Sequence, residues 1–405
     1  MTTLEALYRD LHAHPELAFQ EHRTAGIAAD RMRALGLEVI EGIAGTGVAA
    51  VLSNGPGSTV WLRADMDGLP VEELTGLDYA STSTAVDADG NATPLMHACG
   101  HDIHVTWLVG AMEHLVATRD DWSGTVVAIF QPAEESVTGA KAMVADGLVD
   151  RVPRPDVVLG QHVGPLPAGV ISLTSGTTMA GADEIDVVLH GKGGHGSSPE
   201  RTIDPVYAAA ATVVRLQSIV SRETTPGQLA VVTVGSLHAG TKANIIPSDA
   251  RLGINVRSLD APTRERVVGS IERIVRAEAA ASGMTVEPDI TITASTPATI
   301  NDAEATEILR ARFIEAWSEA AVIDYGTVSG SEDVGVLAAA AGAPLVFWIT
   351  GGADPSAFAA AAAAGRVEQD IPSNHSPYFA PVIDPTLQRG VDALTIAART
   401  FLGER

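Results

Sequence analysis

The sequence predicts an α/β protein: a larger α/β/α domain with a mainly parallel sheet, interrupted by an inserted, ferredoxin-like α+β domain. Three observations support this prediction. Short apolar runs alternate with helical patterns in the first 180 residues and again near the end of the chain. The middle of the chain has a different order of elements. The length of 405 residues, 46% of them hydrophobic, is typical of two domains with a sizeable core.

The larger domain is predicted from its helices and apolar runs. Leu4, Leu7 and Leu11 have helical spacing, and Pro15 separates this helix from a second one. Another helical pattern covers residues 105–116. The apolar runs, each bounded by turn or polar residues, are 60–62, 126–130, 157–159 and 345–349. Such runs indicate buried, mainly parallel strands, and ligands bind beyond the carboxyl ends of strands in such sheets.

The inserted domain is predicted from the order βαββαβ, which is that of a ferredoxin-like sandwich. The expected strands are 184–189, 229–234, 251–256 and 285–292, and the expected helices are 205–220 and 264–281. The predicted organisation is therefore 1–180 for the first part of the larger domain, 181–296 for the insert, and 297–405 for the second part.

The net charge argues against several kinds of partner, and the cysteine content indicates the cellular compartment. The chain carries 50 acidic and 26 basic residues, a net charge of −24, which repels nucleic acids and anionic membranes. Its one cysteine cannot form an intrachain disulfide, which fits a reducing compartment. Met1 to Asp10 has no signal-peptide pattern, and no apolar run approaches the ~20 residues of a membrane span. We therefore expect a soluble, cytoplasmic protein.

The segment Met96–His104 has the highest density of metal-binding residue types. Cys99 and His101 lie two positions apart, so in an extended segment they would point the same way, and Gly100 between them lets the backbone bend. Thiolate and imidazole are preferred ligands of zinc and related divalent ions. The alternative is the start of a helix capped by Asp102, with the histidines incidental.

Glu134 and Glu135 follow a predicted strand, and two adjacent carboxylates repel each other unless a cation lies nearby. One could bind a metal while the other acts as a general base. The alternative is an acidic helix start, favoured by the helix dipole. His162, after another strand, and His375, in a loop, would supply further nitrogen ligands, although a single loop histidine is more often structural.

The inserted domain contains three further candidates. His195 lies in the Gly-rich segment 191–199, which does not have the spacing of a nucleotide-binding loop. Asn244 and Arg257 could hold an oxyanion or a substrate carboxylate. From the residues alone, a turn or surface role is the simpler interpretation of all three.

Nine ordered motifs resemble the M20 family of metallopeptidases, specifically its amidohydrolase branch. This branch includes aminoacylases, hippurate hydrolases, indole-acetyl-amino-acid hydrolases and acyl-glutamine aminoacylases. The similarity extends from about His12 to Ile396. The motifs are HPELAFQE, LRADMDGLP, MHACGHDIH, QPAEES, GQHVG, GKGGHGSSP, KANIIP, SGSED and NHSPYF.

The resemblance implies a catalytic α/β domain, an inserted satellite domain that often mediates dimerisation, and two divalent metal ions, with Zn²⁺ or Mn²⁺ expected before Co²⁺ or Ni²⁺. Glu134 matches the general base. His195 matches a satellite histidine that stabilises the oxyanion, in dimers in the partner's active site. Asn244 and Arg257 match substrate-binding positions. The positions that match metal ligands are Cys99, His101, Glu135, His162 and His375.

The implied activity is hydrolysis of the amide bond of an N-acyl amino acid or a related small conjugate, which releases a carboxylic acid and an amino acid. Arg63 occupies the place where peptidase branches have a ligand histidine, which argues against a dipeptidase and leaves Asp65 at most an indirect role. Glu200 replaces a histidine that many relatives carry. The alternatives are a carbamoyl or peptide hydrolase and a catalytically silent metal-binding relative. The acyl group cannot be predicted.

Overall fold

The computed structural model describes residues 3–86 and 90–404. The chain divides into two compact units. The first comprises Met1–Thr178, Ile300–Thr327 and Asp333–Arg405, and the second comprises Met179–Thr299 and Val328–Glu332. The short return at Val328–Glu332 was not part of the predicted insert. No helix among the described residues is long and apolar enough to cross a membrane.

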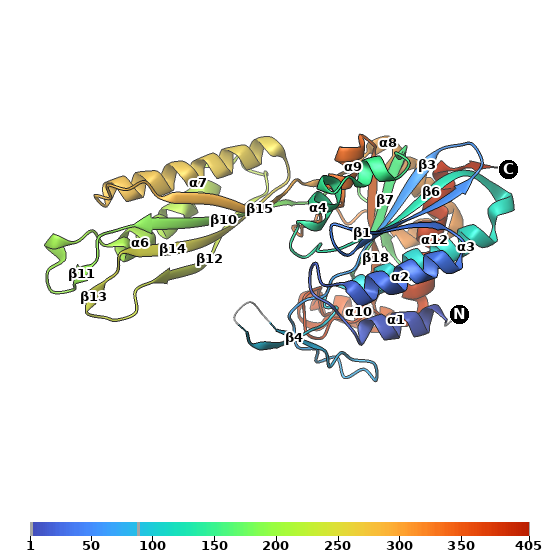
Figure 1. The fold of residues 1–405 in the computed structure, drawn as a ribbon, viewed down its shortest axis with the longest axis horizontal. Coiled ribbons are helices and arrows are strands. Elements are labelled where there is room, and N and C mark those ends of the chain that lie inside the picture. Colours follow the sequence, from blue (N-terminus) through green and yellow to red (C-terminus); the bar gives the residue numbers. More distant parts are fainter. Residues whose placement is uncertain (1–2, 87–89, 405) are drawn as a thin grey trace. The chain divides into compact units, whose positions relative to one another are not determined.

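The first unit is built on a nine-stranded mixed sheet (Figure 1). Its order is β1-β2-β6-β3-β7-β18-β8-β17, and β19 pairs with β6. The four central strands, β6, β3, β7 and β18, are parallel, as the apolar runs predicted. The strands are β1 (Glu38–Ile43), β2 (Gly47–Asn54), β3 (Thr59–Asp65), β6 (Trp122–Gln131), β7 (Val157–Pro167), β8 (Ile171–Ser172), β17 (Val322–Ile323), β18 (Leu345–Ala353) and β19 (Gly403–Glu404).

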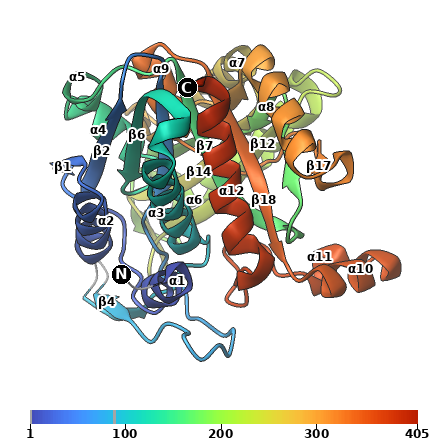
Figure 2. The same ribbon diagram turned by 90° about the vertical axis from the view of Figure 1, so that its right-hand side faces the viewer.

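Helices cover both faces of this sheet, which gives the predicted α/β/α layers (Figure 2). The helices α1 (Leu4–His12), α2 (His22–Ala34), α3 (His101–Ala117) and α12 (Ile383–Phe401) pack on one face. The helices α4 (Gly139–Ala145) and α9 (Val334–Ala341) pack together on the other. Helix α3 is apolar and buried on nearly all sides, because it lies between the sheet and α1, α2 and α12.

The first unit also contains four further α-helices and a hairpin. They are α5 (Leu148–Arg151), α8 (Ala303–Ala316), α10 (Pro355–Ala364), α11 (Val367–Asp370), and the hairpin of β4 (Thr84–Val86) and β5 (Ala92–Pro94). Two strands, β9 (Gly176–Met179) and β16 (Thr299–Asn301), pair with each other.

The second unit has the βαββαβ order expected from the sequence. Its antiparallel sheet has the order β12-β14-β10-β15, and two helices pack on it over a separate core. A two-stranded ribbon, β11 with β13, extends from one end. The elements are β10 (Gly181–His190), β11 (Gly194–His195), α6 (Pro205–Ser218), β12 (Ala230–Ala239), β13 (Ile245–Ile246), β14 (Asp249–Ser258), α7 (Ala261–Ala281) and β15 (Asp289–Thr296).

The predicted position of the last strand of this unit, 285–292, was wrong by several residues. The strand β15 begins at Asp289, directly after Pro288. Proline has no N–H to donate to a neighbouring strand, so regular pairing starts beyond it.

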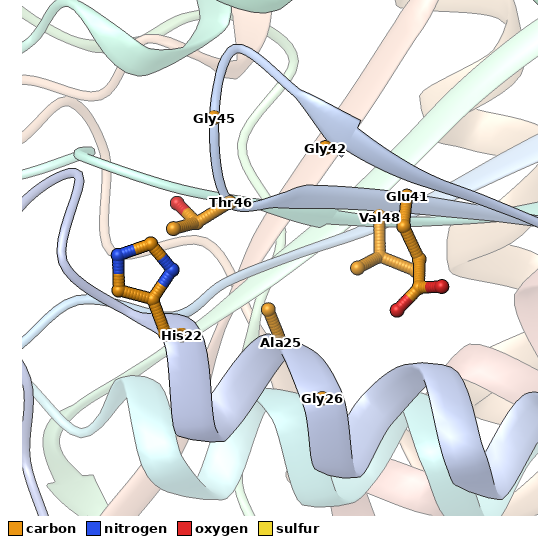
Figure 3. Close-up of a pocket in the computed structure, with 8 residues that line it drawn as sticks. All are labelled: His22, Ala25, Gly26, Glu41, Gly42, Gly45, Thr46 and Val48. Atoms are coloured by element: carbon orange, nitrogen blue, oxygen red, sulfur yellow. The ribbon is translucent and has the colours of Figure 1, made fainter.

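A pocket of about 170 Å³ lies between α2 and the β1–β2 hairpin (Figure 3). Its lining holds none of the predicted site residues; it consists of His22, Ala25, Gly26, Glu41, Gly42, Gly45, Thr46 and Val48. This pocket is therefore not the predicted site, which was expected at the carboxyl ends of the central strands.

Candidate metal centre

The structure brings the five predicted metal ligands together in the first unit, from four separate segments. The Cys99 thiol lies 3.4 Å from Nε2 of His162. Nε2 of His375 is 3.2 Å from Oε2 of Glu135, and Nε2 of His101 is 3.8 Å from Oε1 of the same carboxylate. Cys99, His101 and Glu135 each offer a ligand atom within 4.8 Å of the other two. A divalent ion suits this set of sulfur, nitrogen and oxygen donors.

Gly100 makes the approach of Cys99 and His101 possible, although not by the extended geometry expected from the sequence. It adopts φ 82° at the N-cap of α3, and His101 is the first residue of that helix. A Cβ at position 100 would lie 2.4 Å from Cγ1 of Val163, so only glycine fits there. The alternative of a helix start is correct, although Gly100 and not Asp102 occupies its N-cap, and this helix start carries two of the proposed ligands.

Two ligand imidazoles are oriented by groups behind them. Nδ1 of His162 lies 2.7 Å from the carbonyl of Val163, to which it donates, and this directs Nε2 towards Cys99. Nδ1 of His101 lies 3.2 Å from Oδ1 of Asp67. Asp67 was not predicted from the sequence. The available signal was its place two residues after the end of β3, close to Asp65.

Unpaired donor atoms show that this set fits a metal ion. Among the residues that the structure describes, Nε2 of His101 and Oε1 of Glu135 are buried without a hydrogen-bond partner. Burying such atoms unpaired is unfavourable, and a cation between them would satisfy both. Burial and the Glu135 carboxylate raise the pKa of the Cys99 thiol, and burial lowers the pKa of His162. A neutral imidazole is the form that binds metals, and a cation would stabilise the thiolate.

Glu134 and Glu135 lie in a turn after β6, not in an acidic helix start. The next helix, α4, begins only at Gly139, so the helix-dipole alternative is wrong. Oε2 of Glu134 is 3.8 Å from Nε2 of His101, and its side chain is almost buried. Oε2 of Glu135 lies 3.2 Å from Nε2 of His375, and Glu135 offers a ligand atom close to those of Cys99 and His101. These positions favour Glu135 as a ligand.

Asp65 lies beside a proposed ligand, with Oδ2 3.7 Å from Nε2 of His101, but both of its oxygens are engaged in a buried network. Oδ2 of Asp65 accepts a hydrogen bond from Nη1 of Arg63 at 2.6 Å, and Oδ1 lies 2.5 Å from Nδ1 of His104. Nε2 of His104 accepts the N–H of Val163 at 2.8 Å. Although Asp65, His104, His101 and His162 are close enough to resemble a second metal site, these bonds occupy the ligand atoms of Asp65 and His104. This agrees with the indirect role expected for Asp65.

The other three predicted residues, His195, Asn244 and Arg257, belong to the second unit. The N–H of Ser197 donates to Nδ1 of His195 at 3.1 Å, so the neutral imidazole carries its proton on Nε2. His195 lies in β11, and Asn244 directly precedes β13, where its carbonyl accepts the N–H of Gly196. Arg257 donates to Oδ1 of Asn255 at 3.0 Å and to the hydroxyl of Ser331.

Arg257 lies at the far end of the second unit's sheet from His195. Strand β14 runs from Asp249, opposite His190, to Ser258, and β11 lies beyond His190. Arg257 lies eight positions after Asp249, and eight steps of ~3.3 Å along a strand span about 26 Å. One copy of this unit therefore cannot place both side chains on one small molecule.

The chain is similar to several known proteins. The model of "Peptidase family M20/M25/M40" matches residues 61–395. "Thermostable carboxypeptidase 2" of Saccharolobus solfataricus is 38% identical over 80% of each chain. "Hippurate hydrolase" of Campylobacter jejuni is 38% identical over 82% of this chain and 84% of that protein. The crystal structure of a dinuclear metal-binding M20 peptidase from Bacillus subtilis superposes with a TM-score of 0.76 and 27% identity, and covers 98% of this chain and 96% of that chain.

Proposed function

We propose, from the premise that this chain belongs to peptidase family M20/M25/M40, that it is a metal-dependent amidohydrolase of N-acyl amino acids or related small conjugates. The observation that carries the proposal is the gathering of Glu134 and five donor side chains, one of them the Cys99 thiol, at one place in the first unit. Similar proteins named for this chemistry include a hippurate hydrolase and an N-acyl-L-amino acid amidohydrolase.

The five donors would hold two divalent ions. Zn²⁺ and Mn²⁺ are the first candidates, followed by Co²⁺ and Ni²⁺, because the thiolate favours softer ions while the carboxylate and imidazoles accept several. The bound ions would polarise the scissile carbonyl and lower the pKa of a water molecule. The proposed ligands are Cys99, His101, Glu135, His162 and His375.

Glu134 would act as the general base. Its carboxylate accepts the proton of the attacking water and returns it to the leaving amine, which leaves as an amino acid. The nearly buried position of Glu134 beside His101 supports this role. Burying a carboxylate is unfavourable, and a role as general base would explain why this one lies there. Retention of Glu134 also argues against a silent relative, which could lose its base without losing its ligands.

The satellite residues would complete the site in a homodimer. His195, with its proton on Nε2, is suited to donate to an oxyanion, and Arg257 is suited to bind the carboxylate of the substrate. Because His195 lies beyond one end of the satellite sheet and Arg257 lies near the other, about 26 Å along β14 from Asp249, we propose that His195 serves the partner's active site. Asn244, beside the His195 loop, would contribute to the same site.

The proposed partners are a small N-acyl amino acid substrate and a second copy of the chain, with the enzyme in the cytoplasm. A peptide hydrolase is the second candidate, because the carboxypeptidases of S. solfataricus are as similar as the hippurate hydrolase. Binding to nucleic acid or to membranes is not expected for a chain of charge −24.

The deciding experiment is a substrate panel with added Zn²⁺ or Mn²⁺. The panel contains N-acetyl, N-benzoyl, N-lauroyl and indole-acetyl amino acids, a carbamoyl amino acid and a blocked dipeptide, each assayed with the wild type and with Glu134→Gln. Hydrolysis of at least one acyl amino acid, lost in the variant, supports the proposal. Turnover of only the carbamoyl compound or the dipeptide would replace it, and no turnover by the metal-loaded protein would refute it.

A further inference from the structure

The turn that carries Glu134 begins with a residue in an unusual backbone conformation. Ala133 has φ 53°, in the left-handed region that non-glycine residues rarely occupy. For an L-residue this conformation is unfavourable, so neighbouring contacts have to hold it. The conformation of Ala133 sets the direction in which the chain leaves β6, and therefore where Glu134 lies.

Two buried carboxylates hold three consecutive backbone N–H groups of this turn. Glu21 accepts the N–H of Ala133 at 2.8 Å through Oε1. Asp67 accepts the N–H of Glu134 through Oδ1 and that of Glu135 through Oδ2, both at 3.0 Å. Both carboxylates are almost inaccessible to solvent. Hydrogen bonds to a buried carboxylate are stronger than those between neutral groups.

The local structure frees Glu21 for this contact. Glu21 occupies the N-cap position of α2, where a polar side chain usually accepts the first N–H groups of its own helix. Glu21 makes no such bond. The carboxylate of Glu16 accepts the N–H groups of Arg23 and Thr24 instead, both at 2.8 Å. Helix α2 is therefore capped without Glu21, whose side chain is directed to the turn.

The remaining bonds of Glu21 fix its carboxylate in place. Oε1 also accepts the N–H of Phe19 at 2.9 Å, and Oε2 accepts the hydroxyl of Thr46 at 2.6 Å. Thr46 lies on the β1–β2 hairpin at the wall of the pocket shown in Figure 3. The carboxylate thus connects the start of α2 and this hairpin to the turn after β6.

We propose that Glu21 is a positioning residue for the general base: it holds Ala133 in the left-handed conformation and so fixes the carboxylate of Glu134. This inference rests on the proposed function. Loss of the contact would let the turn relax at Ala133 and shift the neighbouring Glu134, whereas Glu135, one residue farther from Ala133, would keep its place among the ligands. The bonds from Asp67 to the N–H groups of Glu134 and Glu135 would limit the movement to a small displacement. Misplacing a reacting group by about 1 Å can lower the rate about 100-fold.

Variants at position 21 distinguish the effect of the length of the side chain on kcat from the effect of its charge. Glu21→Asp keeps the charge but withdraws the carboxylate by one methylene, so kcat should fall about 10- to 100-fold, with KM and metal content near the wild type. Glu21→Gln loses the charge but keeps an oxygen within reach of Ala133, so kcat should stay within about threefold of the wild type on the same reasoning. The matched control is Glu16→Asp, which withdraws a carboxylate from α2 but touches neither Ala133 nor Glu134.

The measurements are kcat, KM, metal per chain and thermal stability, on the metal-loaded enzyme. Glu16→Asp should lower stability without lowering kcat. An active Glu21→Asp, or a Glu21→Gln that loses more than about tenfold in kcat with its metal retained, would overturn the proposal. If Glu21→Asp does not fold, Glu21→Gln alone still tests it. Glu134→Gln is assayed in parallel: if that variant stays active, the proposed base itself is wrong.

Discussion

Replacement of His12 should show that a buried ion network stabilises the first unit. His12 lies at the end of α1, with Nδ1 2.6 Å from Oδ2 of Asp102 and Nε2 3.0 Å from Oε1 of Glu73. All three side chains are buried. Burial alone would lower the pKa of His12, but the two carboxylates raise this pKa to about 10. An imidazolium thus connects the helix start next to His101 with the loop at Glu73.

The expected magnitude follows from this shift. The pKa rises from 6.5 to about 10, which corresponds to about 5 kcal/mol at 1.36 kcal/mol per unit. Because the folded pKa lies above the unfolded one, this stabilisation is complete below pH 6.5 and is lost as the pH rises towards 10. In His12→Gln both buried carboxylates lose their cationic partner, which costs roughly 3–5 kcal/mol near neutral pH.

Urea unfolding followed by tryptophan fluorescence measures the free energy of unfolding of the first unit. All five tryptophans lie in the first unit, so the signal reports that unit alone. The difference in unfolding free energy between wild type and His12→Gln should be largest near pH 6.5 and shrink towards pH 9.5. The control is His14→Gln, an exposed position that should change little. A difference that stays constant across this range would show that His12 is not charged in the folded protein.

Three further predictions concern the site. Cys99→Ala should remove at least one of about two metal ions per chain, and metal analysis that finds no ion in the wild type, with no activation on adding metal, would refute the site. Glu134→Gln should keep its metal and lose about 10²–10⁴-fold or more in rate, whereas Glu135→Gln should lose metal; normal turnover of the first would require the two roles to be reassigned. His195→Ala should lose about 10²–10³-fold in kcat with metal retained, and an unchanged kcat would restrict the satellite domain to assembly or specificity.

Much of the fold could be predicted because the apolar runs are unambiguous. Runs at 60–62, 126–130, 157–159 and 345–349 became the central parallel strands β3, β6, β7 and β18. The ligand-bearing segments could be found because chemically distinctive residues follow such runs. The start of β15 was misplaced, because local hydrophobicity does not report where Pro288 allows pairing to begin.

The contacts that hold the site in place could not be predicted from the sequence. Asp67 is separated from His101 by 34 positions and Glu21 from Ala133 by 112, so no local pattern relates them. Their acidic side chains are also the kind that sequence patterns assign to the surface. Only the fold shows that these carboxylates are buried and that their oxygens accept hydrogen bonds from backbone N–H groups of a turn.

The separation of His195 and Arg257 within one satellite unit has a genetic consequence. If each active site takes Arg257 from one chain and His195 from its partner, two alleles that are inactive alone can restore each other. In a mixed dimer of His195→Ala and Arg257→Ala chains, one active site inherits both defects and the other inherits neither. A cell that carries both alleles would then grow on a substrate that supports neither strain alone.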